Sequence, residues 1–141
     1  MTVSLVIATF NHARLLGEAL DSALAQTLRG VDVVVVDDGS TDDTPAVLAR
    51  YGTRVRVIRQ PNRGLAAARN AGIAAARGTY LAFLDADDLV APTKLAEQLA
   101  VLERAPSVGW TYCDVIIETT VTGEKMTASE RFGYGARRLD G

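Results

Sequence analysis

The feature that most constrains the fold of this chain is a regular alternation of short apolar runs with segments of helical periodicity. Val3 to Thr9 is a nearly continuous apolar run, and Val33 to Val36 is a β-branched run typical of a central parallel strand. Between them, apolar pairs recur every four residues from Leu15 to Leu24, which predicts a helix that is closed by Gly30. The alternation continues, so strands are expected at 3–9, 31–36, 55–57, 79–84 and 108–117, with further helices near 44–51, 65–77 and 92–104.

This order of elements predicts an α/β fold with a mostly parallel open sheet and helices on both of its faces, as in Rossmann-like domains. In such sheets, ligands bind at the carboxyl ends of the strands. Acidic loops follow the second and fourth expected strands. These two loops hold seven of the chain's 17 acidic residues, namely Asp37, Asp38, Asp42, Asp43, Asp85, Asp87 and Asp88. We therefore expect a ligand site at this edge of the sheet.

The two acidic loops have different interpretations. Asp85, Asp87 and Asp88 come directly after a buried strand, where carboxylates repel one another unless a ligand compensates them. This pattern favours a hard divalent cation held by one or two carboxylates and completed by phosphate oxygens and water. In the other loop, Asp42 and Asp43 are interpreted as residues of Asx turns and helix caps.

Composition excludes several function classes. With 15 Lys and Arg against 17 Asp and Glu, the net charge of -2 argues against a nucleic-acid partner. Cys113 is the single cysteine, which excludes an intramolecular disulfide and cysteine-based zinc fingers. No apolar run approaches the roughly 18–20 residues of a membrane span, and the glycine motifs of dinucleotide and P-loop sites are missing. A cytoplasmic protein is expected, with the inner face of the membrane as the alternative location.

Four motifs together resemble the nucleotide-binding half of family 2 glycosyltransferases, which are inverting GT-A-fold enzymes that use nucleotide-diphosphate sugars. In order, the motifs are SLVIATFN at 4–11, VDDGSTD at 36–42, NRGLAAARNAG at 62–72 and LDADD at 84–88. The resemblance covers residues 3–115 and implies a hexosyltransferase-type enzyme that transfers a sugar to an acceptor hydroxyl with inversion.

The resemblance also implies roles for single positions in nucleotide binding. Thr9, Phe10 and Asn11 are expected to line the nucleotide pocket. Asp38, together with Asp37, is expected to accept a hydrogen bond from a uracil or thymine imide.

Further roles concern the diphosphate and the metal. Arg69 is expected to approach the base or the diphosphate, with a solvated helix face as its alternative. Asp85 and the adjoining Ala86 are expected to contact ribose or a metal-bound water. Asp87 is expected to ligate Mg²⁺ or Mn²⁺, with Asp85 and Asp88 as the competing ligands because three acids blur the D-x-D register.

The reaction partners that the resemblance implies are a UDP-sugar or dTDP-sugar donor and a carbohydrate or lipid-linked acceptor, as in the synthesis of cell-envelope polysaccharide. The catalytic general base is expected from chain that lies C-terminal to Gly141, because no acid after Ile117 stands in a recognisable base motif. Residues 1–117 are therefore expected to form the nucleotide-sugar-binding region, followed at 118–141 by the start of an acceptor-side region or a loosely ordered tail.

Two other functions compete with this one. A nucleotide-binding pseudoenzyme would share the donor site without transferring a sugar. A receiver-like signalling module would instead need acids after its first and third strands, whereas here they follow the second and fourth.

A few remaining residues have structural interpretations. His12 is expected to be an exposed loop residue, with a position near the nucleotide as its alternative. Trp110 and Tyr112 are expected to pack along the fifth strand, and Cys113 is expected to be buried beside them.

Overall fold

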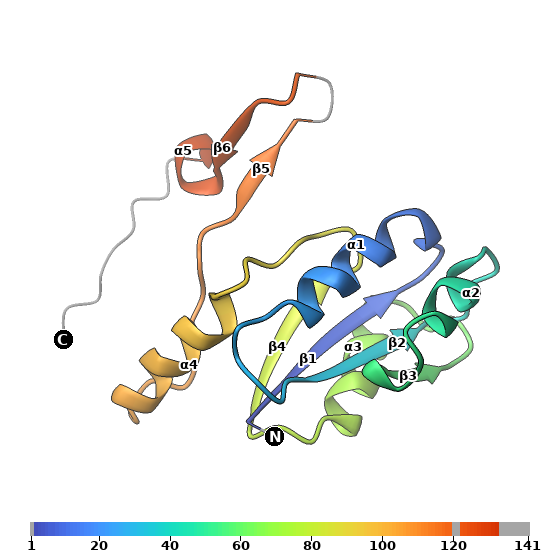
Figure 1. Ribbon diagram of the computed structural model, residues 1–141, viewed down its shortest axis with the longest axis horizontal. Helices are drawn as coiled ribbons and strands as arrows, with labels where there is room; N and C mark the ends of the chain where they lie inside the picture. Colours follow the sequence, from blue (N-terminus) through green and yellow to red (C-terminus); the bar gives the residue numbers. More distant parts are fainter. Residues whose placement is uncertain (1, 120–121, 133–141) are drawn as a thin grey trace. The chain divides into compact units, whose positions relative to one another are not determined.

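The computed structural model describes residues 2–119 and 122–132, which divide into two compact units at residues 100 and 101. The first unit contains a four-stranded sheet whose strands are β1 (Val3–Thr9), β2 (Asp32–Asp37), β3 (Arg56–Arg59) and β4 (Tyr80–Asp85). All neighbouring strands are parallel, and their order is β3-β2-β1-β4 (Figure 1). This architecture confirms the predicted α/β fold with a parallel open sheet.

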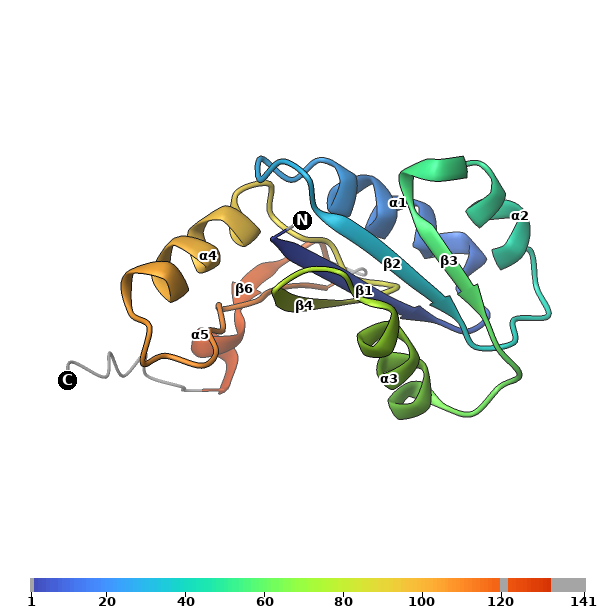
Figure 2. The ribbon, with the colours of Figure 1, turned by 90° about the horizontal axis from the view of Figure 1, so that it is seen from below.

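Helices cover both faces of the sheet. They are α1 (Ala13–Leu24), α2 (Thr44–Ala49), α3 (Leu65–Ala75) and α4 (Lys94–Arg104), with a 3₁₀ turn, η1, at Gly52–Arg54. Figure 2 shows α1 and α2 on one side of the sheet and α3 on the other. None of the helices in the described part of the chain is both long and apolar enough to cross a membrane.

The alternation of side chains along the central strands explains why both faces are covered. On β1, Leu5 and Ile7 belong to a core that includes Leu16 and Leu20 of α1. Val6 points to the other face, where α3 approaches so closely that a Cβ on Gly72 would overlap its side chain. A strand that is apolar on both faces is therefore central, as the continuous run 3–9 predicted.

The strand order creates a switch point beside β1. The chain passes from β1 to β2 on one side, and α3 later returns it to β4 on the other side. The loops that follow β1 and β4 diverge at such a point and leave a crevice at the carboxyl ends of the strands.

The second unit contains β5 (Ile116–Glu118), which pairs antiparallel with β6 (Lys125–Thr127), and the short helix α5 (Ala128–Phe132). The prediction of a strand over 108–117 is therefore wrong for all but its last two residues. Residues 108–115 find no strand partner in the described chain, so the alternating apolar pattern there has no sheet to join.

The packing expected for this segment is also absent. The Trp110 and Tyr112 rings lie 5.7 Å apart between centroids, but each residue is 73% exposed. Cys113 is exposed as well, so its interpretation as a buried small residue is wrong.

Candidate functional site

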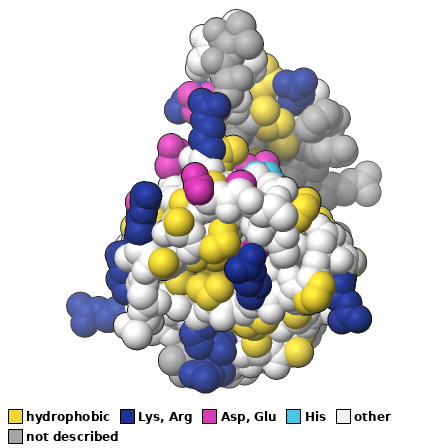
Figure 3. All heavy atoms as spheres, turned by 90° about the vertical axis from the view of Figure 1, so that its right-hand side faces the viewer, with side chains coloured by type: hydrophobic (Ala, Val, Ile, Leu, Met, Phe, Trp, Pro, Cys, Tyr) yellow, Lys and Arg dark blue, Asp and Glu magenta, His cyan; other side chains and the backbone are white. Residues whose placement is uncertain are grey.

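A cavity of about 460 Å³ opens in the first unit at the carboxyl ends of the strands. The ends of β1, β2 and β4 and the start of α3 contribute its walls. Its lining residues are Ala8, Thr9, Phe10, His12, Asp38, Asn62, Gly64, Leu65, Ala68, Asp85, Ala86 and Asp87. Figure 3 views the molecule from the side to which β1 and β2 point, where acidic and hydrophobic side chains are exposed on the same face. The cavity thus combines apolar walls with carboxylates, as small-molecule sites commonly do.

The end of β1 supplies a buried hydroxyl and an exposed aromatic ring to the cavity. Thr9 is 3% exposed, and its Oγ1 is a buried atom without a hydrogen-bond partner among the described residues. Phe10 follows with 41% of its surface exposed. This step from buried to exposed residues marks the point where β1 leaves the sheet.

Asn11 does not line the cavity but joins the loop after β1 to the loop after β2. Its φ of 56° lies in the left-handed region, which asparagine tolerates better than most residues. Its backbone N–H donates to Ser40 Oγ at 2.9 Å, and its Oδ1 accepts the Thr41 backbone N–H at 2.8 Å. Asn11 therefore fixes the position of the loop after β1 relative to the loop after β2.

The two aspartates at the end of β2 have different environments. Asp37 is 1% exposed, accepts the Ser40 backbone N–H at 2.9 Å and lies 3.4 Å from Arg59 Nε, away from the cavity lining. Asp38 lines the cavity, and its backbone N–H donates to Thr9 O at 2.9 Å. Successive side chains point to opposite sides of an extended segment, so only one of two adjacent aspartates reaches the cavity.

The Asp38 carboxylate anchors the segment that leads into α3. Oδ1 accepts from Gln60 Nε2 at 2.6 Å and from the Arg63 backbone N–H at 3.0 Å. Oδ2 accepts from the Gly64 backbone N–H at 2.8 Å. Burial opposes ionisation, but these hydrogen bonds outweigh it and hold the pKa of Asp38 below its usual value. Asp38 is thus an ionised acceptor at the cavity.

Gly39 allows the segment that leads into α3 to lie close to the loop after β2. Its φ is +81°, and a Cβ at this position would lie 2.7 Å from the backbone nitrogen of Asn62. Asn62, Gly64 and Leu65 thereby become lining residues. They carry no charge or metal-ligand chemistry, and the motif at 62–72 was the sequence signal that could have identified them.

The end of β4 and the segment after it bring two carboxylates to the rim. Asp85 and Asp87 both line the cavity, whereas Asp88 is not among the lining residues. Burial and the neighbouring carboxylates of Asp87 and Asp85 raise the pKa of Asp88 above its usual value. Ala86, between the two lining acids, is buried and belongs to the core.

Arg69 contacts one of these acids from α3. Its Nη2 lies 2.6 Å from Asp85 Oδ1, and the side chains of Arg69 and Asp85 are 38% and 51% exposed. Arg69 itself is not among the lining residues. It is neither a freely solvated helix residue nor a wall of the cavity, but a partner of an acid at the rim.

His12 lines the cavity, in contrast to its interpretation as an exposed loop residue. It is half-buried, and its Nδ1 is buried without a hydrogen-bond partner among the described residues. Because it directly precedes α1, its position depends on how the loop after β1 turns, for which periodicity carries no information.

The donor set fits a divalent cation that is shared with a ligand. Within residues 2–119 and 122–132, no three His, Cys, Asp or Glu side chains converge as a complete metal site. Two carboxylates, those of Asp85 and Asp87, line the cavity at its rim. Mg²⁺ and Mn²⁺ are commonly held by one or two carboxylates and completed by substrate phosphates and water.

Comparison with known proteins identifies relatives of the whole site region. A model of glycosyl transferase family 2 matches residues 4–139. The succinoglycan biosynthesis protein ExoO of Rhizobium meliloti is 49% identical over 109 residues, which are 76% of this chain and 30% of that protein.

Two solved structures share the fold. The crystal structure of S. aureus TarS 1-349 in complex with UDP-GlcNAc matches with a TM-score of 0.68 and 27% identity, over 75% of this chain and 32% of that one. The mannosyltransferase PcManGT from Pyrobaculum calidifontis, in complex with GDP-Man and Mn²⁺, matches with a TM-score of 0.63 and 33% identity, over 71% of this chain and 32% of that one.

The chain thus spans about a third of the length of these relatives. The match to the family model extends over nearly all of the sequence, and the parallel α/β fold matches the TarS and PcManGT structures. The chain belongs to glycosyl transferase family 2.

Proposed function

We propose that this chain forms the donor-binding part of a metal-dependent, inverting glycosyltransferase that transfers a sugar from a nucleotide-diphosphate sugar to an acceptor hydroxyl. The observation that carries the proposal is one cavity that joins the ionised Asp38 to the rim carboxylates Asp85 and Asp87. Related structures contain UDP-GlcNAc and, with Mn²⁺, GDP-Man. A nucleotide-diphosphate sugar carries a nucleobase whose N–H needs a hydrogen-bond acceptor, and it also carries an anionic diphosphate that binds a cation. These two requirements match Asp38 and the rim carboxylates.

The base is proposed to bind near Asp38. A carboxylate has about four lone-pair positions, and Oδ2 accepts from the backbone N–H groups of Gly64 at 2.8 Å and Arg63 at 3.2 Å, the second of which is shared with Oδ1. We propose that Oδ2 also accepts the imide N–H of uracil or thymine, with Thr9 and Phe10 beside the nucleoside. Asn11 and Asp37 act indirectly, because their hydrogen bonds hold the loops that carry the lining residues.

The diphosphate is proposed to lie toward the segment after β4. Asp87 would hold Mg²⁺ or Mn²⁺, with Asp85 as the second carboxylate and Asp88 as the alternative outside the lining. Such an ion, when bound, neutralises charge on the diphosphate leaving group and orients it. Ala86 and Asp85 are proposed to lie along the ribose, and Arg69 to contact the diphosphate.

The acceptor is proposed to be a carbohydrate or lipid-linked hydroxyl. Inversion requires a general base on the acceptor side. Two of the described acids beyond Ile117 are engaged locally: Glu118 pairs with Lys125 at 3.1 Å, and Glu130 accepts from the Thr127 backbone N–H at 2.7 Å. We assign the base to none of them, so binding of nucleotide without transfer is the second candidate for the chain by itself.

Calorimetric titration of UDP into the chain, with and without Mn²⁺, tests the proposal. We expect Mn²⁺ to strengthen UDP binding at least tenfold, and Asp87→Asn to abolish this gain without lowering the melting temperature. Asp43→Asn is the matched control, because Asp43 is exposed, makes no side-chain cap and does not line the cavity. Absence of UDP binding, or a gain from Mn²⁺ that survives Asp87→Asn, contradicts the proposal.

A further inference from the structure

Arg69 and Asp85 form an ion pair across the rim of the cavity. The pair joins α3 to the end of β4, and its N–O distance of 2.6 Å is that of a charge-assisted hydrogen bond. Asp85 lines the cavity, and its Oδ1 is already engaged by Arg69. One of the two rim carboxylates is therefore compensated by the protein's own cation.

The other rim carboxylate has no such partner. Asp87 is exposed, lines the cavity and makes no hydrogen bond or ion pair with any described residue. A cation that enters without nucleotide meets one free carboxylate and one that is paired with a guanidinium. To use Asp85 fully, it must displace Arg69 or bind close to its positive charge, and both are unfavourable.

A diphosphate changes this balance. It offers phosphate oxygens to the guanidinium, which binds them through two parallel N–H donors. Arg69 then has an alternative partner, and Asp85 becomes available to the cation. Since 38% of the Arg69 side chain is exposed, it is not locked in place by packing.

We propose that Arg69 is a positioning residue that holds Asp85 in the absence of donor and thereby makes metal binding depend on nucleotide binding. This inference rests on the proposed function, since it requires that the cation and the diphosphate share the site. By linkage, the factor by which nucleotide strengthens metal binding equals the factor by which metal strengthens nucleotide binding.

The size of the effect follows from exposure. Ion pairs that are partly open to solvent stabilise weakly, so Arg69 is expected to weaken the binding of metal alone by about fivefold. Removing Arg69 also removes a diphosphate contact. Arg69→Gln should therefore bind Mn²⁺ alone more tightly and UDP less tightly, which are opposite changes that a general loss of structure does not produce.

The test measures Mn²⁺ binding to the full chain by electron paramagnetic resonance, alone and with saturating UDP. We expect Arg69→Gln to bind Mn²⁺ alone about fivefold more tightly than the unmodified chain does. We also expect saturating UDP to increase the Mn²⁺ affinity of this variant by a smaller factor than it does in the unmodified chain. Arg63→Gln is the matched control, since it removes the same charge from an exposed position without a pair to Asp85. It should leave Mn²⁺ binding within twofold.

A second variant separates the ion pair from general electrostatics. In an Asp85→Asn background, Arg69→Gln should change the affinity for Mn²⁺ alone by less than twofold, because the pair no longer exists. An unchanged or weaker Mn²⁺ affinity in Arg69→Gln, or an equal gain in Arg63→Gln, overturns the inference. If the unmodified chain does not bind UDP with Mn²⁺, the proposed function fails first. If it does bind and Arg69→Gln shows no gain for Mn²⁺ alone, only the role of Arg69 is refuted.

Discussion

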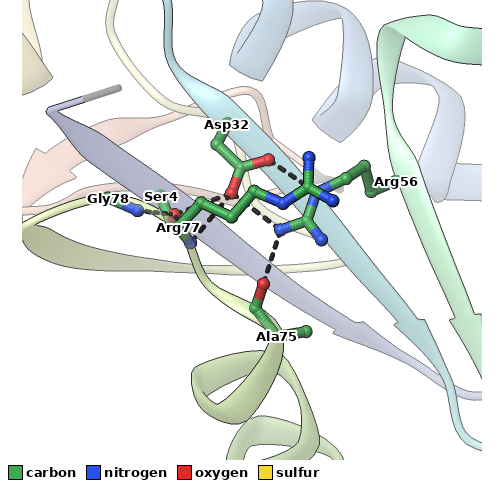
Figure 4. A network of polar contacts seen from close by, with 6 residues as sticks. All are labelled: Ser4, Asp32, Arg56, Ala75, Arg77 and Gly78. Carbon is green, nitrogen blue, oxygen red and sulfur yellow. Dashed lines mark hydrogen bonds and ion pairs between the residues drawn. The ribbon is translucent and has the colours of Figure 1, made fainter.

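Asp32 and Arg56 form a doubly hydrogen-bonded ion pair at the ends of β2 and β3 that lie opposite the cavity. Arg56 Nε donates to Asp32 Oδ1 at 2.8 Å, and Nη2 donates to Oδ2 at 2.7 Å (Figure 4). The Ser4 hydroxyl donates to the same carboxylate at 2.8 Å, and Arg56 reaches the Ala75 carbonyl oxygen at 2.7 Å. The network joins three strands to the end of α3, and the Asp32 side chain is only 3% exposed.

Removal of the cation from this pair should destabilise the fold. Arg56→Met leaves a buried carboxylate without its main partner, and we expect a loss of about 3 kcal/mol in the free energy of unfolding. Urea denaturation followed by far-ultraviolet circular dichroism measures the loss. Arg50→Met, at an exposed position outside the network, should change the free energy of unfolding by less than about 0.5 kcal/mol.

The same pair predicts a pH dependence. The hydrogen bonds from Arg56 outweigh burial and hold the pKa of Asp32 below its usual value of 3.8. The unfolded chain therefore takes up a proton before the folded chain does, so the stabilisation is complete above the unfolded pKa and is lost as pH falls through the folded one. The difference between the unmodified chain and Arg56→Met should be constant from pH 6 to 8 and shrink below about pH 4. A difference that persists unchanged at pH 3 contradicts this account.

Gly78 marks a close contact between the turn before β4 and the start of β1. A Cβ at this position would lie 2.5 Å from Ser4 N and 2.6 Å from Val3 C, both backbone atoms. Because backbone atoms cannot rotate away, Gly78→Ala should cost about 2–3 kcal/mol in urea denaturation. Gly109→Ala, where the added methyl group meets nothing within 4 Å, is the control and should be nearly neutral. Equal costs at the two positions would refute the steric explanation.

Asn11 allows two contributions to loop stability to be measured separately. Asn11→Gly removes the hydrogen bonds to Thr41 and Asp42 but accepts the φ of 56°, so it should cost about 1 kcal/mol. Asn11→Ala loses the same hydrogen bonds and also forces alanine into the left-handed region, so it should lower the free energy of unfolding by about 2 kcal/mol in total. Thermal unfolding of the two variants gives the difference. If alanine is no worse than glycine, the backbone conformation carries no cost.

Asp38 should distinguish recognition of the base from recognition of the diphosphate. We expect Asp38→Ala to weaken UDP binding at least tenfold and pyrophosphate binding by less than threefold, because pyrophosphate lacks the imide. Asp38→Asn keeps one acceptor oxygen for the Gly64 N–H and controls for collapse of the anchored segment. Competition calorimetry with both ligands provides the measurement, and equal losses for UDP and pyrophosphate would contradict base recognition.

The difference between sequence and structure is clearest at the acidic loop that follows β2. Both Asp37 and Asp38 follow the Val33–Val36 run, and the sequence placed both at the ligand edge. In the structure, Asp38 lines the cavity while Asp37 bonds to Ser40 within its own loop. The order of strands places both residues at the same edge, and the alternation of side chains turns them to opposite sides of the chain. Which side faces the cavity is decided by the segments that pack there, such as residues 62–65.

The prediction of a strand at 108–117 was wrong for another reason. Its alternating apolar residues match a strand, yet only 116–118 form one, paired with β6. A β-strand is stabilised by hydrogen bonds to a neighbouring strand, and the sequence of one segment does not show whether a neighbouring strand is present.

By itself, the sequence determined the parallel α/β sheet, the edge that holds the acids and the family. These follow from local periodicity and from short motifs, both of which are written along the chain. The tertiary structure alone decided which acids reach the cavity, the approach of residues 62–65, the cavity position of His12 and the pairing of Arg69 with Asp85. Each of these depends on contacts between segments far apart in sequence or on loops without periodicity, where the geometry of the folded chain is the physical cause.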